Sequence, residues 1–152
     1  MLDLVNEFFD TRNDPDQISV DETERELLAA IHPSTLSELA NEDGPIVWIL
    51  VVPTSTETMN RFLAGLISEK QLLFETKPGA KYDAIYLCSA SVLPEFRNKG
   101  LAKKVTIDAV NAIRKDHPIK ALYYWPFSGE GKSLALAVAT TTGLSLFDRT
   151  EE

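Results

Sequence analysis

The stretch SVLPEFRNKGLA, residues 91–102, joins a predicted strand to a predicted helix. Apolar and β-branched residues predict the strand over 82–92, and apolar residues at helical spacing predict the helix over 99–115. The N–H groups in the first turn of a helix lack intrahelical acceptors and lie at the positive end of the helix dipole, so they bind anions. Gly100 allows the backbone to come close to such an anion.

The same stretch is basic, although the chain carries a formal net charge of -8. Residues 1–76 contain fifteen Asp and Glu against four Lys and Arg, whereas residues 77–152 contain eight against eleven. Four basic residues fall within eight positions that hold no acid: Arg97, Lys99, Lys103 and Lys104. Such a cluster attracts phosphate, but a solvated face of the helix explains it as well.

The composition predicts one globular domain over residues 1–152. Hydrophobic residues make up 44% and charged residues 25%, ordinary values that exclude a disordered or collagen-like chain. The longest apolar run, Ile46 to Val52, is too short to cross a membrane, and no basic residue precedes Arg12 as a secretory signal requires. Because Cys88 is the single cysteine, an internal disulfide or a multi-cysteine metal site is excluded. We therefore expect a cytoplasmic protein that binds neither membrane nor nucleic acid.

Helix and strand patterns alternate along the chain. A capping box at Ser19 and Glu22 and another at Thr54 and Glu57 predict two helix starts. The predicted helices cover 2–9, 19–32, 54–67, 99–115 and 133–140, and the predicted strands cover 46–52, 82–92, 121–125 and 144–147. This order indicates an α/β or α+β fold. Strands 82–92 and 121–125 are expected to be parallel neighbours, because a crossover helix joins them.

The pattern Val92-x-Pro94-x-Phe96-Arg97-x-x-Gly100-x-Ala102 resembles the acetyl-coenzyme A motif of the GNAT superfamily of N-acetyltransferases. That motif is a Val-x-Pro strand exit, an aromatic residue, and then Arg/Gln-x-x-Gly-x-Gly/Ala. Every fixed position is met, and a looser match extends over residues 82–149. The resemblance implies the acyl-CoA N-acyltransferase fold: a mixed, mostly antiparallel, twisted sheet with helices on both faces. Its two central parallel strands splay apart, and the coenzyme lies between them.

The resemblance also implies which residues bind acetyl-CoA, the expected co-substrate. The backbone of Ala90 and Val92 would meet the pantetheine arm and the thioester. The pyrophosphate would be bound by the turn that follows: Arg97, Asn98, Lys99, Gly100, Leu101, Ala102 and Lys103. No metal is expected. Residues 81–152 would form the acetyl-CoA-binding half, and residues 1–80 the divergent half facing a small-molecule or peptide amine. A homodimer is left open.

The chain departs from the family at the catalytic acid. The family usually has Asn-x-x-Ala-x-x-x-Tyr on the next helix, and here Lys132 takes the Asn place, Ala135 the Ala place and Ala139 the Tyr place. The tyrosine that protonates the leaving thiolate is therefore missing. Five substitutes are near in sequence, each also explained by packing: Tyr86, Cys88, Tyr124, Ser133 and Thr140. We expect an acyltransferase that moves acetyl from acetyl-CoA to a primary amine of an unidentified acceptor by direct attack; the alternative is a coenzyme A-binding module with little or no transferase activity.

Two further patterns are interpreted as structural. Residues 126–133, PFSGEGKS, end like a phosphate-binding Walker A loop, but Pro126 stands where its first glycine belongs, and only nineteen residues follow Ser133. His32 and His117 each precede a proline at a predicted helix end, where a donor interacts favourably with the last carbonyls.

Overall fold

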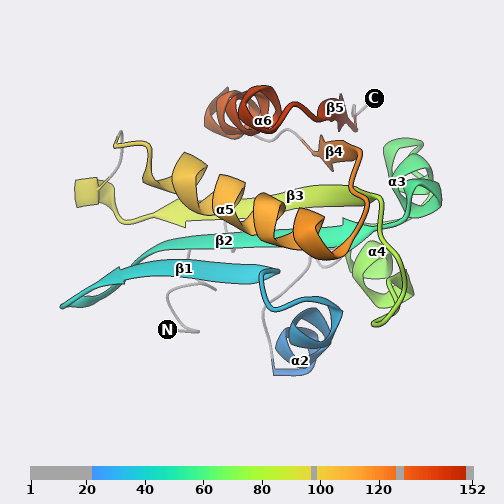
Figure 1. The fold of residues 1–152 in the computed structure, drawn as a ribbon, viewed down its shortest axis with the longest axis horizontal. Coiled ribbons are helices and arrows are strands. Elements are labelled where there is room, and N and C mark those ends of the chain that lie inside the picture. The colour runs from blue at the N-terminus through green and yellow to red at the C-terminus, as the bar shows by residue number, and fades with distance from the viewer. Residues whose placement is uncertain (1–21, 97–98, 126–128, 150–152) are drawn as a thin grey trace.

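The computed structural model describes residues 22–96, 99–125 and 129–149 (Figure 1). One mixed sheet has its strands in the order β1 (Leu36–Asn41), β2 (Gly44–Thr54), β3 (Ala84–Val92), β4 (Ala121–Tyr124) and β5 (Ser145–Asp148). Five helices accompany it in the described residues: α2 (Glu22–Ile31), α3 (Thr56–Leu63), α4 (Glu69–Glu75), α5 (Leu101–Asp116) and α6 (Gly129–Thr142). The described chain is thus α+β. The helix predicted over 2–9 and the capping residue Ser19 lie outside the described residues.

The strand–helix–strand unit of the second half is confirmed. β3 and β4 are parallel neighbours, with Ala84 opposite Ala121 and Leu87 opposite Tyr124, and α5 connects them. α5 packs on β2 and on α6, and in Figure 1 it lies across the sheet. The pairing differs in one respect from the expected, mostly antiparallel sheet. β1–β2 and β2–β3 are antiparallel, whereas β3–β4 and β4–β5 are parallel, so the described strands are evenly divided.

The centre of the sheet is buried on both faces. Tyr86 and Tyr123 lie on one face, where their rings contact Phe62 of α3 at centroid distances of 4.8 and 5.9 Å. Ile85 and Leu122 alternate with the tyrosines along their strands, so they point to the other face, and both are fully buried. The expectation of a sheet covered on both faces therefore holds for this part of the molecule.

The first half differs from prediction at two elements. β1 was not predicted; it forms a hairpin with β2 across residues 42–43, and Leu36–Asn41 contains no β-branched residue that would have marked it. The helix predicted over 54–67 corresponds to α3 alone, because α4 starts beyond that range, at Glu69. Thr54 belongs to β2 and Ser55 is the N-cap of α3, which ends at Leu63 before Gly65 takes a φ of +79°. Leu66, which lies within the predicted helix range, is 70% exposed because α3 has already ended.

The histidines hold helix ends together. His32 Nε2 donates to Asp116 Oδ2 at 2.7 Å, while the Ser34 N–H donates to His32 Nδ1 at 3.0 Å. His117 stacks against the ring of Tyr82 at 4.6 Å. These contacts join the C-terminal ends of α2 and α5. None of the helices within 22–96, 99–125 and 129–149 is both long and apolar enough to cross a membrane.

Candidate functional site

The two parallel strands at the centre of the sheet have unequal lengths, and this leaves one strand edge open. β4 pairs with β3 only as far as Leu87 and Tyr124. β3 continues to Val92, still paired with β2 on its other side. Among the described residues, no strand lies beside Cys88–Val92 on the β4 side. β4 is therefore paired with only the first half of β3.

The direction of the β3 backbone follows from its ladder with β2. The Leu93 N–H donates to the Ile46 carbonyl at 3.0 Å. In an antiparallel ladder, residues that exchange hydrogen bonds alternate with residues that do not. The register pairs Ser91 with Trp48, two positions along from Leu93 and Ile46, so Ser91 and Trp48 also form a hydrogen-bonded pair. Ala90 and Val92 occupy the alternate positions, which are not hydrogen-bonded to β2. The N–H and C=O groups of Ala90 and Val92 therefore point away from β2, toward the open edge.

The open edge leads into the start of α5. Gly100, exposed, is the N-cap residue with a left-handed φ of 73°, and no side chain caps the helix among the described contacts. The first bond of the helix runs from the Lys104 N–H to the Gly100 carbonyl at 3.1 Å. The N–H groups of the three residues between them precede the intrahelical ladder. The first turn of α5 contains no acidic residue.

The side chains around this turn are mostly cationic. Lys99 and Lys103 are exposed, and Lys104 forms an ion pair with Asp108 at 2.9 Å. Leu101 and Ala102 are half-buried against the core. Two predicted coenzyme-binding residues, Arg97 and Asn98, lie outside the described residues. The turn thus brings an uncapped helix start and unburied ammonium groups to the end of the open edge.

A β-bulge at Cys88 marks the point where the strands part. The register of β2 with β3 shifts from Val51–Leu87 to Leu50–Ser89, so Cys88 is the extra residue. Its Sγ lies 3.8 Å from Oε2 of Glu69, the first residue of α4. Tyr86 donates its hydroxyl proton to the same carboxylate oxygen. Glu69 is 1% exposed and Tyr86 fully buried, whereas Cys88 is half-buried.

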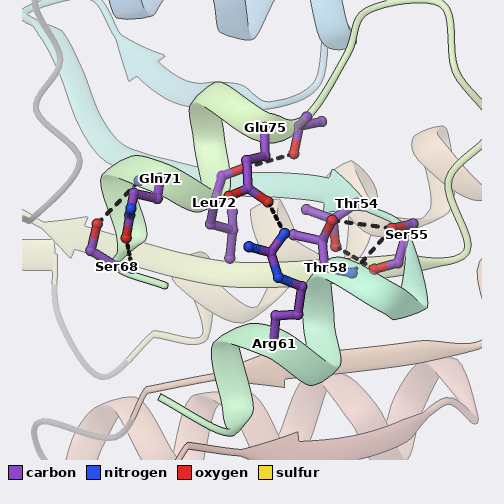
Figure 2. A network of polar contacts seen from close by, with 9 residues as sticks. Thr54, Ser55, Thr58, Arg61, Ser68, Gln71, Leu72 and Glu75 are labelled. Atoms are coloured by element: carbon purple, nitrogen blue, oxygen red, sulfur yellow. Dashed lines mark hydrogen bonds and ion pairs between the residues drawn. The ribbon is translucent and has the colours of Figure 1, made fainter. Parts of the chain in front are cut away.

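The position of Glu69 is fixed by the α3–α4 pair. Ser68 and Gln71 form a reciprocal capping box that starts α4 one residue before Glu69. Arg61 of α3 forms an ion pair with Glu75 at the other end of α4, as Figure 2 shows. Both contacts lie outside the core, and together they hold α4 with its first residue turned toward β3.

The other predicted catalytic residues are not brought to this cluster. Burial raises the pKa of Tyr124, and the nearby Asp148 raises it further. Tyr124 ends the β3–β4 ladder opposite Leu87 and so lies at the mouth of the open edge. Ser133 and Thr140 are exposed on α6, and no hydrogen bond between described residues joins either one to Glu69. Of the five candidates, the structure thus groups only Tyr86 and Cys88.

The neighbouring face of the sheet is aromatic and tightly bonded. The Tyr123 and Thr54 hydroxyls share a hydrogen bond of 2.7 Å, and burial raises the pKa of Tyr123, so this phenol stays protonated. Arg149 lies over the Trp125 ring at 4.1 Å and over the Phe62 ring at 4.7 Å. The guanidinium ties the end of β4 to α3. Tyr123 is therefore a structural residue.

Glu69 was missed in the sequence because it lies far from its partners along the chain. It lies 17 positions before Tyr86 and 19 positions before Cys88. The signal that could have found it is the pattern Ser68-x-x-Gln71, which starts a helix with Glu69 in its first turn. In the described part of the chain, no three His, Cys, Asp or Glu side chains are grouped to hold a metal ion.

The chain was compared with known proteins. No protein-family model matches it, and a search of the curated proteins finds no match either.

Proposed function

We propose that this protein is an acetyl-CoA-dependent acyltransferase that moves an acetyl group to a primary amine, on an acyl-CoA N-acyltransferase fold. The proposal rests on one observation: the open edge of β3 is followed along the chain, after a 3-10 helix at Pro94–Phe96, by the acid-free start of α5, which no side chain caps among the described contacts. Pantetheine is an extended chain with two amide groups, which suits hydrogen bonding to a free strand edge. A pyrophosphate suits the start of a helix.

The described residues fit two parts of such a ligand, the pantetheine arm and the pyrophosphate. The backbone groups of Ala90, which point to the open edge, would hold a pantetheine amide. The N–H groups of Leu101, Ala102 and Lys103 would hold the pyrophosphate, with Lys99 adding positive charge. Among the described residues, nothing lies within 4 Å of the position where a Cβ of Gly100 would stand, so in this part of the chain the backbone of the turn is open to a ligand.

The transfer needs a polarised thioester, a neutral amine and a proton for the departing thiolate. A backbone N–H near Val92 would polarise the thioester carbonyl. Orientation of the two reactants contributes much of the rate enhancement, because a well-placed pair lowers the activation barrier by about 7–11 kcal/mol. The excess of Asp and Glu in residues 1–76 suits a cationic amine as the acceptor.

The second candidate is a coenzyme A-binding module with little or no transferase activity. The observation that favours it is Ala139 of α6, which is buried in the core of the protein. It stands at the position of the family's catalytic tyrosine and carries no hydroxyl. Such a module would keep the open edge and the turn but would not protonate the leaving thiolate.

Two measurements on the full chain separate these functions. Calorimetric titration with acetyl-CoA tests binding, and we expect 1:1 binding that weakens with added salt because phosphates are bound. Thiol release from acetyl-CoA, measured with a panel of primary amines, tests transfer. Release that depends on one class of amine supports the acyltransferase. Binding without release supports the module, and absence of binding excludes both.

A further inference from the structure

Glu69 and the two side chains that contact its Oε2 atom, Tyr86 and Cys88, form a cluster whose members differ in how far they are exposed. Tyr86 is fully buried and Glu69 is 1% exposed, so neither can meet a bulky substrate directly. Cys88 is half-buried and is therefore the member of the cluster that a substrate can reach. It also lies on the stretch of β3 that has no strand beside it on the β4 side in the described chain. The sulfur thus lies between a buried carboxylate and the open edge.

We propose that Cys88 is a nucleophile that accepts the acetyl group from the thioester before the amine does, with Glu69 as its base. This inference rests on the proposed function for its acetyl donor. The Glu69 carboxylate takes the proton of the Cys88 thiol, and the sulfur attacks the thioester carbonyl carbon. The carbon–sulfur bond to the coenzyme breaks, and the departing thiolate takes the proton back from Glu69. One thioester replaces another, so the step needs no other reactant.

The second half of the cycle uses the same groups. A neutral amine attacks the acetyl-cysteine, the bond between the acetyl carbon and Cys88 Sγ breaks, and an amide forms. The proton released by the amine passes to Glu69 and from there to the Cys88 sulfur, which restores the starting state. The carboxylate therefore supplies in turn the proton that each leaving thiolate needs, a task for which Ala139, at the position of the family's tyrosine, has no hydroxyl.

Three features of the fold favour Cys88 for this role. The bulge makes Cys88 the extra residue of β3, and bulges re-aim side chains beside functional sites. The Ser89 hydroxyl donates to Cys88 Sγ at 3.7 Å, which stabilises negative charge that develops on the sulfur. Tyr86 holds the carboxylate in place from the buried side.

The direct test is the mass of the intact protein after brief exposure to acetyl-CoA without an amine. We expect one acetyl group per chain, removed by hydroxylamine, which cleaves thioesters and leaves acetylated lysines intact. Because Cys88 is the single cysteine, the adduct has one possible site. Cys88→Ala should abolish the labile adduct and reduce amine-dependent thiol release at least tenfold, and Cys88→Ser should do the same. Circular dichroism shows whether either variant is folded.

The role of Glu69 needs a measurement that a purely structural role would not move. Glu69→Gln keeps the size of the side chain and its position at the start of α4. We expect acetylation of Cys88 to slow at least tenfold at pH 7 and to become dependent on free thiolate, rising about tenfold per pH unit. Alkylation by iodoacetamide needs only the thiolate. It should be unchanged or faster in the variant, because a neighbouring negative charge has been removed. A parallel loss of both reactions would show that Glu69 is structural.

A small acetyl thioester, S-acetyl-N-acetylcysteamine, separates this inference from the proposed function. It lacks the pyrophosphate, so it can acetylate Cys88 even if acetyl-CoA does not bind. If acetyl-CoA fails to bind but the small thioester gives the hydroxylamine-labile adduct, the proposed function is wrong and the nucleophile remains. The inference is overturned if acetyl-CoA binds and no labile adduct forms, or if folded Cys88→Ala transfers acetyl at the parent rate. It is equally overturned if neither thioester labels Cys88.

Discussion

The two halves of β3 differ in burial and in the number of strands paired with them. Ala84, Ile85 and Tyr86 are fully buried and lie between two paired strands. From Cys88 onward the strand keeps its partner β2, Ala90 is exposed, and no described strand lies on the other side. The same strand is thus core at one end and a surface edge at the other. A substitution in the first half should change stability, and one in the second half should change binding.

The largest expected effect is at the buried half. Ile85→Ala removes a fully buried side chain from the middle of the sheet, and we expect the free energy of unfolding to fall by about 2–5 kcal/mol. Urea denaturation measures this. The control is Ala90→Ser at the exposed half, where the change should stay within about 0.5 kcal/mol. Equal losses at the two positions would contradict the division of β3.

Proline substitutions at adjacent positions test the direction of the backbone. Ser89→Pro removes an N–H that the register directs to β2, and an unmade buried hydrogen bond costs about 1–3 kcal/mol. Ala90→Pro removes an N–H that points to the open edge, so it should cost less stability but weaken acetyl-CoA binding at least tenfold. Denaturation and calorimetry on both variants check the pair. If Ala90→Pro destabilises the protein as much as Ser89→Pro, the assignment of the open edge is wrong.

The turn at the end of the open edge is tested at Gly100. Its φ of 73° is strained for a branched residue, and a valine side chain would occupy the space the phosphate needs. We expect Gly100→Val to weaken acetyl-CoA binding tenfold or more, which is about 1.4 kcal/mol. The strain adds a loss of stability of about 1–2 kcal/mol. Gly100→Asn is the matched control for strain, because asparagine tolerates this conformation.

The outcome at Gly100 separates two explanations of the motif. If both variants are folded and Gly100→Val binds acetyl-CoA as tightly as the parent, the turn does not bind phosphate and the proposed function fails. If the valine and asparagine variants lose stability equally, the left-handed conformation is not what requires glycine here.

Local signals explain which parts of the fold could be predicted. The β3–α5–β4 unit was predicted because the apolar run before Pro94 and the helical spacing of Ala109 and Ile113 are visible in short windows, and a crossover fixes parallel pairing. β1 escaped because its residues have low strand propensity and it forms only by pairing with β2.

The candidate site was predictable only in part, for the same reason. The turn at Gly100 follows from its own sequence, whereas the contact of Glu69 with Cys88 depends on how α4 packs against the sheet. A side-chain cluster from two elements needs tertiary structure, which no pattern in one segment contains. The bulge at Cys88 was invisible as well, since it is a mismatch between two strands rather than a property of either.

The smallest expected effect is a dependence of stability on pH. It concerns His117, the C-cap residue of α5, whose ring lies against Tyr82 just before β3. Burial and the neighbouring His32 lower the pKa of His117, and Asp116 opposes them. The unfolded chain therefore takes up a proton near pH 6.5 that the folded chain resists. Stability from this histidine is present above that pH and is lost as the pH falls below it.

His117→Gln cannot be protonated, so it should reduce the loss of stability between pH 7 and pH 5. Urea midpoints at the two pH values measure the slope. Acetyl-CoA binding at pH 7 should be unchanged, because His117 caps the far end of α5 from Gly100. A steeper slope in the variant would reverse the sign assigned to His117. A change in acetyl-CoA binding would show that the surroundings of His117 and the open edge are coupled.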